Sequence, residues 1–377
     1  MTGKLRFYFL DNLRVVAMAL VIAHHAAMPY GPPGGMWPIQ EAVRADVLDG
    51  FFTVNRSFGM SLFFMIAGYF TVMSCDRSGP RKFVKSRLVR LGIPLLAVSL
   101  VFLLLNVLLS RGEDGSLSPA WPIEAGHMWF VQHLLVYSLG YALWCTIHPH
   151  RDGTPRKLAP VPRWWAIVVF SVVLGFVSGV VRIWSPVDDW SYLLGFLKVA
   201  WADVPRDLSL FVLGAVAYRH QWVTRFSTRA GMAWLGAGLF LAAMCYAYYM
   251  GLAGILGLSQ AAAGAIEVFW ESLLCSSMCI GLTVLFRERA NVQTGLLKWL
   301  AQAQYTAYVI HVFVVVGFQA PLLGLAMPPL AKFALVTAAS VPATFLIAGL
   351  IGKVLGVMLA ALGTKAAARP RTVPAGR

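Results

Sequence analysis

Apolar runs of about 20 residues recur along almost the whole chain, and short polar segments separate them. A helix needs about 20 mostly apolar residues to cross the hydrocarbon core of a bilayer. The pattern predicts ten membrane-spanning helices, at residues 8–28, 53–75, 91–110, 127–147, 164–184, 190–218, 231–250, 265–286, 303–323 and 332–352. We expect an all-α polytopic bundle, with one membrane-embedded domain over residues 1–360 and a basic, disordered cytoplasmic tail over residues 361–377.

The sixth predicted span, residues 190–218, is the least regular of the ten. Charged residues interrupt its middle, among them Lys198, Asp203 and Arg206. Non-helical backbone is tolerated at membrane depth where other parts of the protein bury it. A short re-entrant piece followed by a helix is therefore the alternative to one continuous span.

Composition agrees with a membrane protein. Of the 377 residues, 59% are hydrophobic and only 12% are charged, and the mean hydropathy is +0.70. Soluble domains carry about 25% charged residues. The five cysteines lie in or beside apolar runs and are odd in number, so no disulfide framework is indicated.

The basic residues predict how the chain is oriented in the membrane. Most of the 31 Lys and Arg residues fall in the segments on one side of the predicted spans. Because cytoplasmic loops retain positive charge, both termini are predicted to be cytoplasmic. The net charge of +15 follows from the same asymmetry and indicates no nucleic-acid partner.

Two ionisable residues share one face of the first predicted span. Arg14 and His25 are eleven residues apart, which amounts to about three helical turns and roughly 16 Å along the axis. Hydrocarbon strongly disfavours such groups, so their presence in a span indicates a function.

Five short motifs follow one another along these spans. They are the Arg14 and His25 pair, the segment 60–69, which is similar to "FFxISGY" with Ala67 in place of Ser, the "RxxR" of Arg87 and Arg90, the "HLWFL"-like segment 127–131, and the "YxxYLxH"-like segment 305–311. In this order they resemble the acyltransferase 3 family of bacterial membrane O-acyltransferases, part of the transmembrane acyltransferase superfamily.

The resemblance implies O-acyl transfer in the bacterial cytoplasmic (inner) membrane. An acyl group, acetyl or succinyl in our prediction, would move from cytoplasmic acyl-CoA to a hydroxyl of a glycan, a lipid-linked sugar or another acceptor at the membrane. A hydroxyl needs a base, and the ordinary pKa of histidine, about 6.5, suits that role. His25 is the predicted general base. Arg14 is expected to position the donor, although it could instead pair with Asp11.

Three further residues are expected at the donor site. Coenzyme A carries several phosphates, which the forked donors of arginine bind well. Arg87 and Arg90 lie one helical turn apart in a predicted cytoplasmic loop and could hold these phosphates, although the positive-inside rule would also account for them. His311 lies inside the ninth predicted span, where ionisable groups are rare, and is predicted to serve the same site.

Four residues are candidates for binding the acceptor. His127 and Trp129 begin the fourth predicted span at its outer interface, where aromatic anchoring is the alternative explanation. Glu267 and Glu271 are four residues apart on one face of the eighth predicted span. Hydrogen bonding between helices would explain this pair equally well.

The sequence lacks the motifs of several other chemistries. It contains no Gly-x-Ser-x-Gly elbow, no His-Glu-x-x-His motif and no Walker loop, so no metal cofactor is expected. Two other classes remain as alternatives. A glycosyltransferase that uses a lipid-phosphate sugar would need an outer carboxylate, such as Asp46 or Asp49. A transporter or flippase of glycan precursors would explain charged residues in spans without any reaction.

Overall fold

The computed structural model describes residues 7–31, 37–109, 126–148 and 158–361. Residues 362–377 of the predicted tail lie outside this part. The long helices are α1 Tyr8–Ala27, α2 Val47–Ser78, α4 Ile93–Leu109, α5 Trp129–Ile147, α6 Trp164–Arg182, α7 Val204–Arg219, α9 Thr228–Ala247, α11 Gln260–Arg289, α12 Gly295–Gln319 and α13 Pro329–Ala361. The short helices are α3 Pro80–Arg87, α8 Trp222–Arg225 and α10 Ala253–Leu256, with single turns at Leu88–Gly92, Gly126–Met128, Tyr248–Leu252 and Ala320–Leu322.

The predicted polytopic helical bundle is confirmed. In the described ranges, nine helices are long and apolar enough to cross a membrane. Helix α6 ends at Arg182, which contacts Glu271, and α9 begins at Thr228, which contacts Glu288. Glu271 and Glu288 are 17 residues apart on α11, so the chain must run back along the bundle between α6 and α9. Helix α7 makes this passage with 16 residues, or about 24 Å. It corresponds to the second part of the sixth predicted span; α7 is not among the nine helices, so a tenth crossing stays a prediction.

The sixth predicted span is wrong in its first part. Residues 190–203 do not continue α7 but contain a small antiparallel hairpin, β1 Ser191–Leu193 and β2 Leu197–Val199. The hairpin packs on α5, where the Gln132 amide donates to the Phe196 carbonyl and accepts from the Lys198 backbone N–H. These bonds satisfy backbone groups that hydrocarbon would leave unpaired, so the re-entrant alternative describes this segment better.

The two ends of the bundle differ in charge. Arg77 lies in the last turn of α2, Arg219 ends α7 and Arg287 lies in the last turn of α11. Asn12, near the start of α1, donates to the carbonyls of Ala290 and Val292 just beyond α11, so the start of α1 lies at this same end. We call it the basic end, which the sequence predicts to be cytoplasmic, and we call the opposite one the outer end.

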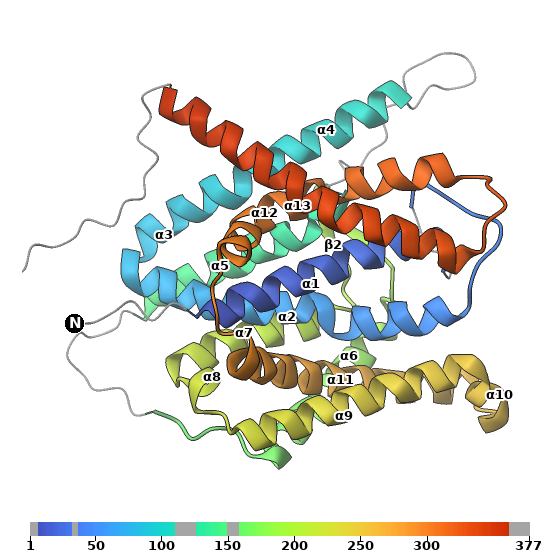
Figure 1. Cartoon of the computed structure of the whole chain (residues 1–377). Helices are drawn as coiled ribbons and strands as arrows, with labels where there is room; N and C mark the ends of the chain where they lie inside the picture. The colour runs from blue at the N-terminus through green and yellow to red at the C-terminus, as the bar shows by residue number, and fades with distance from the viewer. Residues whose placement is uncertain (1–6, 32–36, 110–125, 149–157, 362–377) are drawn as a thin grey trace, which may run out of the picture.

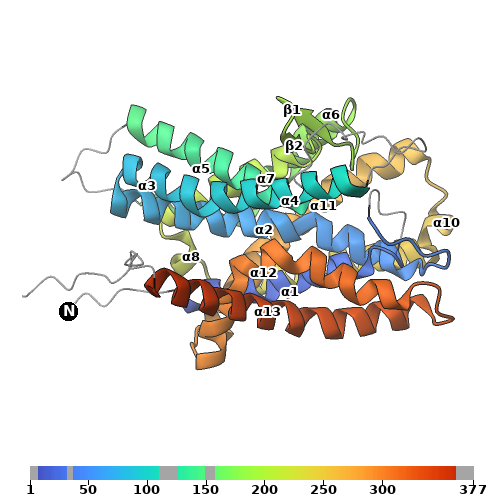
Figure 2. The ribbon, with the colours of Figure 1, turned by 90° about the horizontal axis from the view of Figure 1, so that it is seen from above.

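Helices α1 and α2 run through the middle of the molecule and divide it into two halves (Figure 1). One half contains α4, α5, α12 and α13, whose buried side chains form one apolar cluster with α1 and α2. The other half contains α6, α7, α9 and α11, which form a second cluster with the same two helices. Seen from above, the long helices lie roughly along one common direction (Figure 2). We call these halves the α12 half and the α11 half.

Two glycines allow α2 and α7 to touch backbone to backbone. A Cβ added at Gly68 would lie 2.0 Å from the Phe211 carbonyl oxygen, and one added at Gly214 would lie 1.9 Å from the Met65 carbonyl oxygen. Small residues permit this close approach in membranes. Gly68 belongs to the "FFxISGY"-like segment, so its place in that motif has a packing reason.

Near the outer end of the α11 half, charged residues from four helices form a buried ion-pair network. Glu271 of α11, only 2% exposed, contacts Arg56 of α2 at 3.2 Å, Arg206 of α7 at 3.7 Å, and also Arg182 of α6. The network further includes Asp203, Asp207 and Ser61: Arg206 donates to Asp203 and Ser61, and the Ser61 hydroxyl donates to Asp207. The opposite charges join the helices at a depth where an unpaired charge is costly.

Alanine at Gly68 tests the backbone contact between α2 and α7. We expect Gly68→Ala to lower the free energy of unfolding by about 1–3 kcal/mol, because the added methyl group forces the two backbones apart. The control is Gly236→Ala in α9, where the new methyl group meets open space and should stabilise the helix slightly. Thermal unfolding in detergent compares the two variants. Equal melting temperatures would contradict the packing argument.

Neutralising Glu271 tests the ion-pair network. Glu271→Gln should cost about 3–5 kcal/mol of stability, because it leaves buried guanidinium groups without their carboxylate. Glu267→Gln is the matched control on the same face of α11: its side chain is 39% exposed and lies 3.7 Å from Arg56, so we expect a cost below about 1 kcal/mol. Thermal unfolding in detergent again compares the variants. Similar losses of stability in both would show that the burial of Glu271 does not matter.

Candidate functional site

Three histidines from distant parts of the sequence meet in the α12 half. The ring centroid of His311 lies 4.8 Å from that of His25 and 4.9 Å from that of His127. His25 is in the last turn of α1, His127 immediately precedes α5, and His311 is on α12. His311 is fully buried and His127 nearly so. The sequence predicted a role for each residue separately; the structure brings all three into one group, the histidine cluster.

Hydrogen bonds define which nitrogen of each neutral ring is basic. The Nδ1 of His25 lies 2.9 Å from the Val21 carbonyl, the Nδ1 of His311 lies 2.6 Å from the Tyr308 carbonyl, and the Nε2 of His127 lies 3.0 Å from the Val309 carbonyl. A carbonyl oxygen only accepts, so each of these nitrogens carries the hydrogen. The other nitrogen of each neutral ring is then an acceptor.

Two of these acceptor nitrogens have no partner within the described part of the chain. They are Nε2 of His311 and Nδ1 of His127, and both are buried. An unsatisfied buried nitrogen is costly in a membrane, so it indicates a site for a bound group that donates a hydrogen. The histidine cluster thus offers unpaired acceptor nitrogens on neighbouring rings.

Tyr308 fixes the position of His127 from the neighbouring turn of α12. Its hydroxyl donates to the His127 carbonyl, and its ring centroid lies 5.7 Å from the His127 ring. Tyr308 and His311 are three residues apart, so they share one face of α12. This face of α12 therefore carries both the buried His311 and Tyr308, which positions His127.

An outer segment, residues 37–46, packs against the histidine cluster through Trp37. The Trp37 ring centroid lies 5.3 Å from that of His25, and its indole N–H donates to the side-chain oxygen of Gln319 at 2.9 Å. The Gln319 amide in turn donates to the carbonyls of His25 at 3.0 Å and Ala26 at 3.2 Å. Gln319 is completely buried, and it links the end of α1 to the outer segment.

Further contacts hold the same outer segment in place. Lys332 pairs with Glu41 at 2.6 Å, and the Ala45 N–H donates to the Tyr30 carbonyl. Burial and the nearby Glu41 carboxylate raise the pKa of Tyr30 to about 12, so its phenol stays protonated. The buried Tyr30 hydroxyl has no partner among the described residues. The outer segment is therefore held to α13 through Lys332 and to the residues that follow α1 through Tyr30.

The main contacts of His24 are with α2, although its ring centroid lies 5.7 Å from that of His25. Its Nδ1 accepts from the Asn55 amide at 3.2 Å, and its ring packs against Phe52. These contacts join α1 to α2. The structure thus separates two adjacent histidines into one that lies in the cluster and one that connects helices.

Three arginines gather toward the basic end. The charges of Asp11 and Arg90 both act on Arg14, and those of Arg90 and Arg14 act on Arg87. Arg87 donates to the Thr71 hydroxyl at 3.4 Å and stacks over the Phe83 ring. We call Arg14, Arg87 and Arg90 the arginine cluster. Three positive charges that act on one another make the group suited to an anionic ligand.

The predicted cytoplasmic loop around Arg87 and Arg90 is in fact helical. Arg87 ends α3, and Arg90 lies in a π-helical turn, Leu88–Gly92, that leads directly into α4. The basic residues had concealed the helix in the hydropathy pattern. Single π-helical turns are frequent at functional sites, because they change the direction of side chains within a helix.

Polar side chains with unused hydrogen-bonding capacity lie between the two clusters. The side chain of Gln304 on α12 is only 3% exposed, and neither of its polar atoms has a partner in the described ranges. The Tyr305 hydroxyl is likewise buried without one. Gln304 lies about 10 Å along the helix from His311, toward the basic end. One face of α12 therefore offers donors and acceptors between the arginine and histidine clusters.

The other predicted acceptor residues lie elsewhere. Trp129 packs against Trp190 and His133, beside the hairpin. Glu271 and Glu267 belong to the α11 half, where Glu271 contacts three arginines. Their contacts are those of interhelical pairing, the alternative that the sequence left open; a role in acceptor binding stays a prediction. Within the described chain, no group of three His, Cys, Asp or Glu residues could hold a metal ion.

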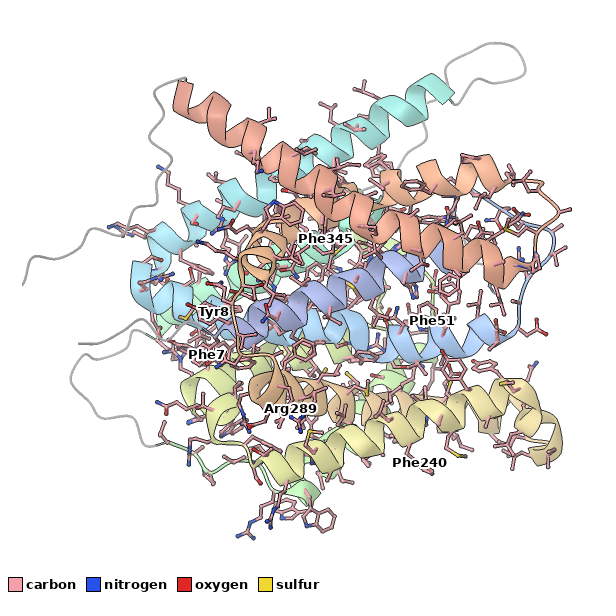
Figure 3. All side chains as sticks on the ribbon, in the orientation of Figure 1. Phe7, Tyr8, Phe51, Phe240, Arg289 and Phe345 are labelled. Atoms are coloured by element: carbon pink, nitrogen blue, oxygen red, sulfur yellow. The ribbon has the colours of Figure 1, made fainter. Side chains whose placement is uncertain are left out.

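Sequence reasoning missed the residues that support the histidine cluster. Trp37 lies in an outer segment without periodicity, and nothing in the pattern connects it with Gln319, 282 residues away. Gln319 and Gln304 did carry a signal, since amides are uncommon in apolar spans. Figure 3 draws the side chains of the described residues on the ribbon and shows how they fill the space between the helices.

Comparison with known proteins identifies the family of the chain. The family described as "Acyltransferase domain" matches residues 7–349. Two relatives are named "Glucans biosynthesis protein C": one from Salmonella gallinarum (strain 287/91 / NCTC 13346), 26% identical over 336 residues, and one from Salmonella heidelberg (strain SL476), 25% identical over 331 residues. Each match covers 81% of this chain and 81% of the relative. No solved structure matches the chain.

The family match spans both halves of the bundle and includes the histidine cluster, the arginine cluster and the ion-pair network. A multi-pass membrane protein with this match is an O-acyltransferase. The chain therefore belongs to the acyltransferase 3 family.

Proposed function

We propose that the protein transfers an acetyl or succinyl group from cytoplasmic acyl-CoA to a hydroxyl of a glucan at the outer side of the membrane, with His25 as the general base. The observation that carries this proposal is the arrangement along α1. Arg14 belongs to the arginine cluster near the basic end and His25 to the histidine cluster near the outer end, on one face of the same helix.

The donor would enter from the basic end. The phosphates of coenzyme A bind the arginine cluster, where guanidinium groups make charge-assisted hydrogen bonds. The arm that carries the thioester contains amides, and these pair with the unused polar groups of Gln304 and Tyr305. The acyl group then reaches the histidine cluster, while the nucleotide stays at the cytoplasmic side.

The acceptor would approach from the outer end. Nδ1 of His25 holds its hydrogen against the Val21 carbonyl, so Nε2 can take the proton of an incoming hydroxyl. The hydroxyl oxygen forms a bond to the thioester carbonyl carbon, the carbon–sulfur bond breaks, and the proton passes to the departing thiolate. The names of two relatives, "Glucans biosynthesis protein C", support a glucan as the acceptor.

Replacing His25 tests its role as the base. His25→Gln keeps a polar side chain but removes the basic nitrogen, so we expect turnover to fall by about 10²–10⁴-fold. His24→Gln is the matched control on the same helix turn: the His24 nitrogen accepts from Asn55, and the ring meets the cluster only at the edge of His25. The assay incubates purified protein with isotopically labelled acetyl-CoA or succinyl-CoA and a glucan, and mass spectrometry measures the product. Normal turnover by a well-folded His25→Gln protein would refute the assignment.

Removing Arg87 and Arg90 together tests donor binding. We expect the double Arg87→Ala, Arg90→Ala variant to raise the KM for acyl-CoA by about tenfold or more, because two phosphate contacts are lost, and to change the KM for the glucan little. The control pair, Arg81→Ala with Lys82→Ala, removes two exposed charges from the same helix. If both double variants raise the KM for acyl-CoA equally, Arg87 and Arg90 serve only to orient the chain in the membrane.

A further inference from the structure

The α11 half contains a cavity of about 240 Å³ that the reaction does not use. Helices α2, α6, α7, α8 and α11 surround it, and no residue of the histidine or arginine cluster lines it. Its wall is almost entirely apolar and includes Met65, Ile167, Phe170, Leu213, Cys279 and Val284. The cavity lies toward the basic end, because its lining includes α8 and the last part of α7.

Because its wall is apolar, the cavity favours a hydrocarbon occupant. Apolar cavities of this kind stay dry, since water needs several polar partners. The outward faces of the two flanking helices are exposed and apolar, with Val169 on α6 and Val212 on α7 each at least half exposed. In a membrane those faces contact lipid chains, so the bilayer itself supplies the molecules that can fill the cavity.

The basic-end rim of the cavity carries positive charge and one unused donor. Arg163 follows the lining residue Pro162, and both Arg163 and Arg225 are exposed. Arg225 links α8 to the segment before α6, because it donates to the Ala159 carbonyl at 3.0 Å. Trp222 lines the cavity, and its buried indole N–H has no partner within the described residues. The acidic Glu288 nearby is already paired with Arg287.

We propose that this cavity binds one acyl chain of an anionic phospholipid from the cytoplasmic leaflet, with the lipid phosphate held by Arg163 and Arg225. Basic pockets between membrane helices on the cytoplasmic side suit such head groups, and the anionic cytoplasmic leaflet supplies them. The Trp222 N–H donates to a carbonyl of the same lipid. The bound chain fills space between α6 and α7, so the lipid is a structural ligand of the α11 half and is independent of the acyl-transfer reaction.

Photolabelling of the full-length protein tests this proposal. The probe is phosphatidylglycerol with a photoreactive diazirine in its acyl chain, incorporated into nanodiscs with the purified protein, and mass spectrometry locates the label. We expect label on cavity-lining peptides of α6, α7 and α11. Ala217→Phe fills the cavity and should reduce this labelling about tenfold, which corresponds to about 1.4 kcal/mol. Val212→Phe is the matched control on the lipid-facing side of α7 and should leave the labelling unchanged.

The head-group part of the proposal has its own test. Unlabelled phosphatidylglycerol should compete with the probe better than phosphatidylcholine does, and the Arg163→Gln, Arg225→Gln pair should remove this preference. The Arg81→Gln, Lys82→Gln pair, at the same end of the other half, should keep it. Equal competition by both lipids would overturn the anionic specificity, and label spread evenly over all lipid-facing helices would overturn the site itself. If Ala217→Phe does not fold, Ala166→Phe fills the same cavity from α6.

Discussion

The pairing of Glu271 with three arginines determines how the α11 half is assembled. Arg56, Arg182 and Arg206 come from three different helices and meet one carboxylate on a fourth. In a medium of low dielectric constant, a guanidinium without a partner carries a large desolvation cost, so each of these helices is held in place by the requirement that its charge be compensated. Apolar packing alone gives little direction between membrane helices, because lipid tails are as apolar as leucine.

The α12 half is built on the opposite arrangement. Its histidine nitrogens and the amide of Gln304 are buried with hydrogen-bonding capacity left over, although the same solvent surrounds them. Such groups persist only where the rest of the fold supplies the stability, and α1 and α2, which pack in both apolar clusters, connect the two halves. The protein thus separates the ion pairs that fix the architecture from the unpaired polar groups that the proposed reaction uses.

The sequence predicted most of the spans and the residues of both the histidine and arginine clusters, because hydropathy periods and intramembrane ionisable groups are local signals. It did not predict which of them would meet. Glu271 and His311 looked alike as single polar residues in apolar spans, yet one has three partners and the other has an unsatisfied nitrogen. The hairpin Ser191–Val199 and the contact of Trp37 with Gln319 depend on residues far away in the chain, which no period reveals.

Helix α1 contains neither glycine nor proline from Tyr8 to Ala27, so it has no point at which it can readily bend. A rod of this kind transmits displacement along its whole length. Under the proposed mechanism, a displacement of Arg14 by the bound donor would reach His25 near the other end of the helix, and from there the carbonyls that accept from Gln319. The proposed donor and acceptor sites are thus connected through one continuous helix.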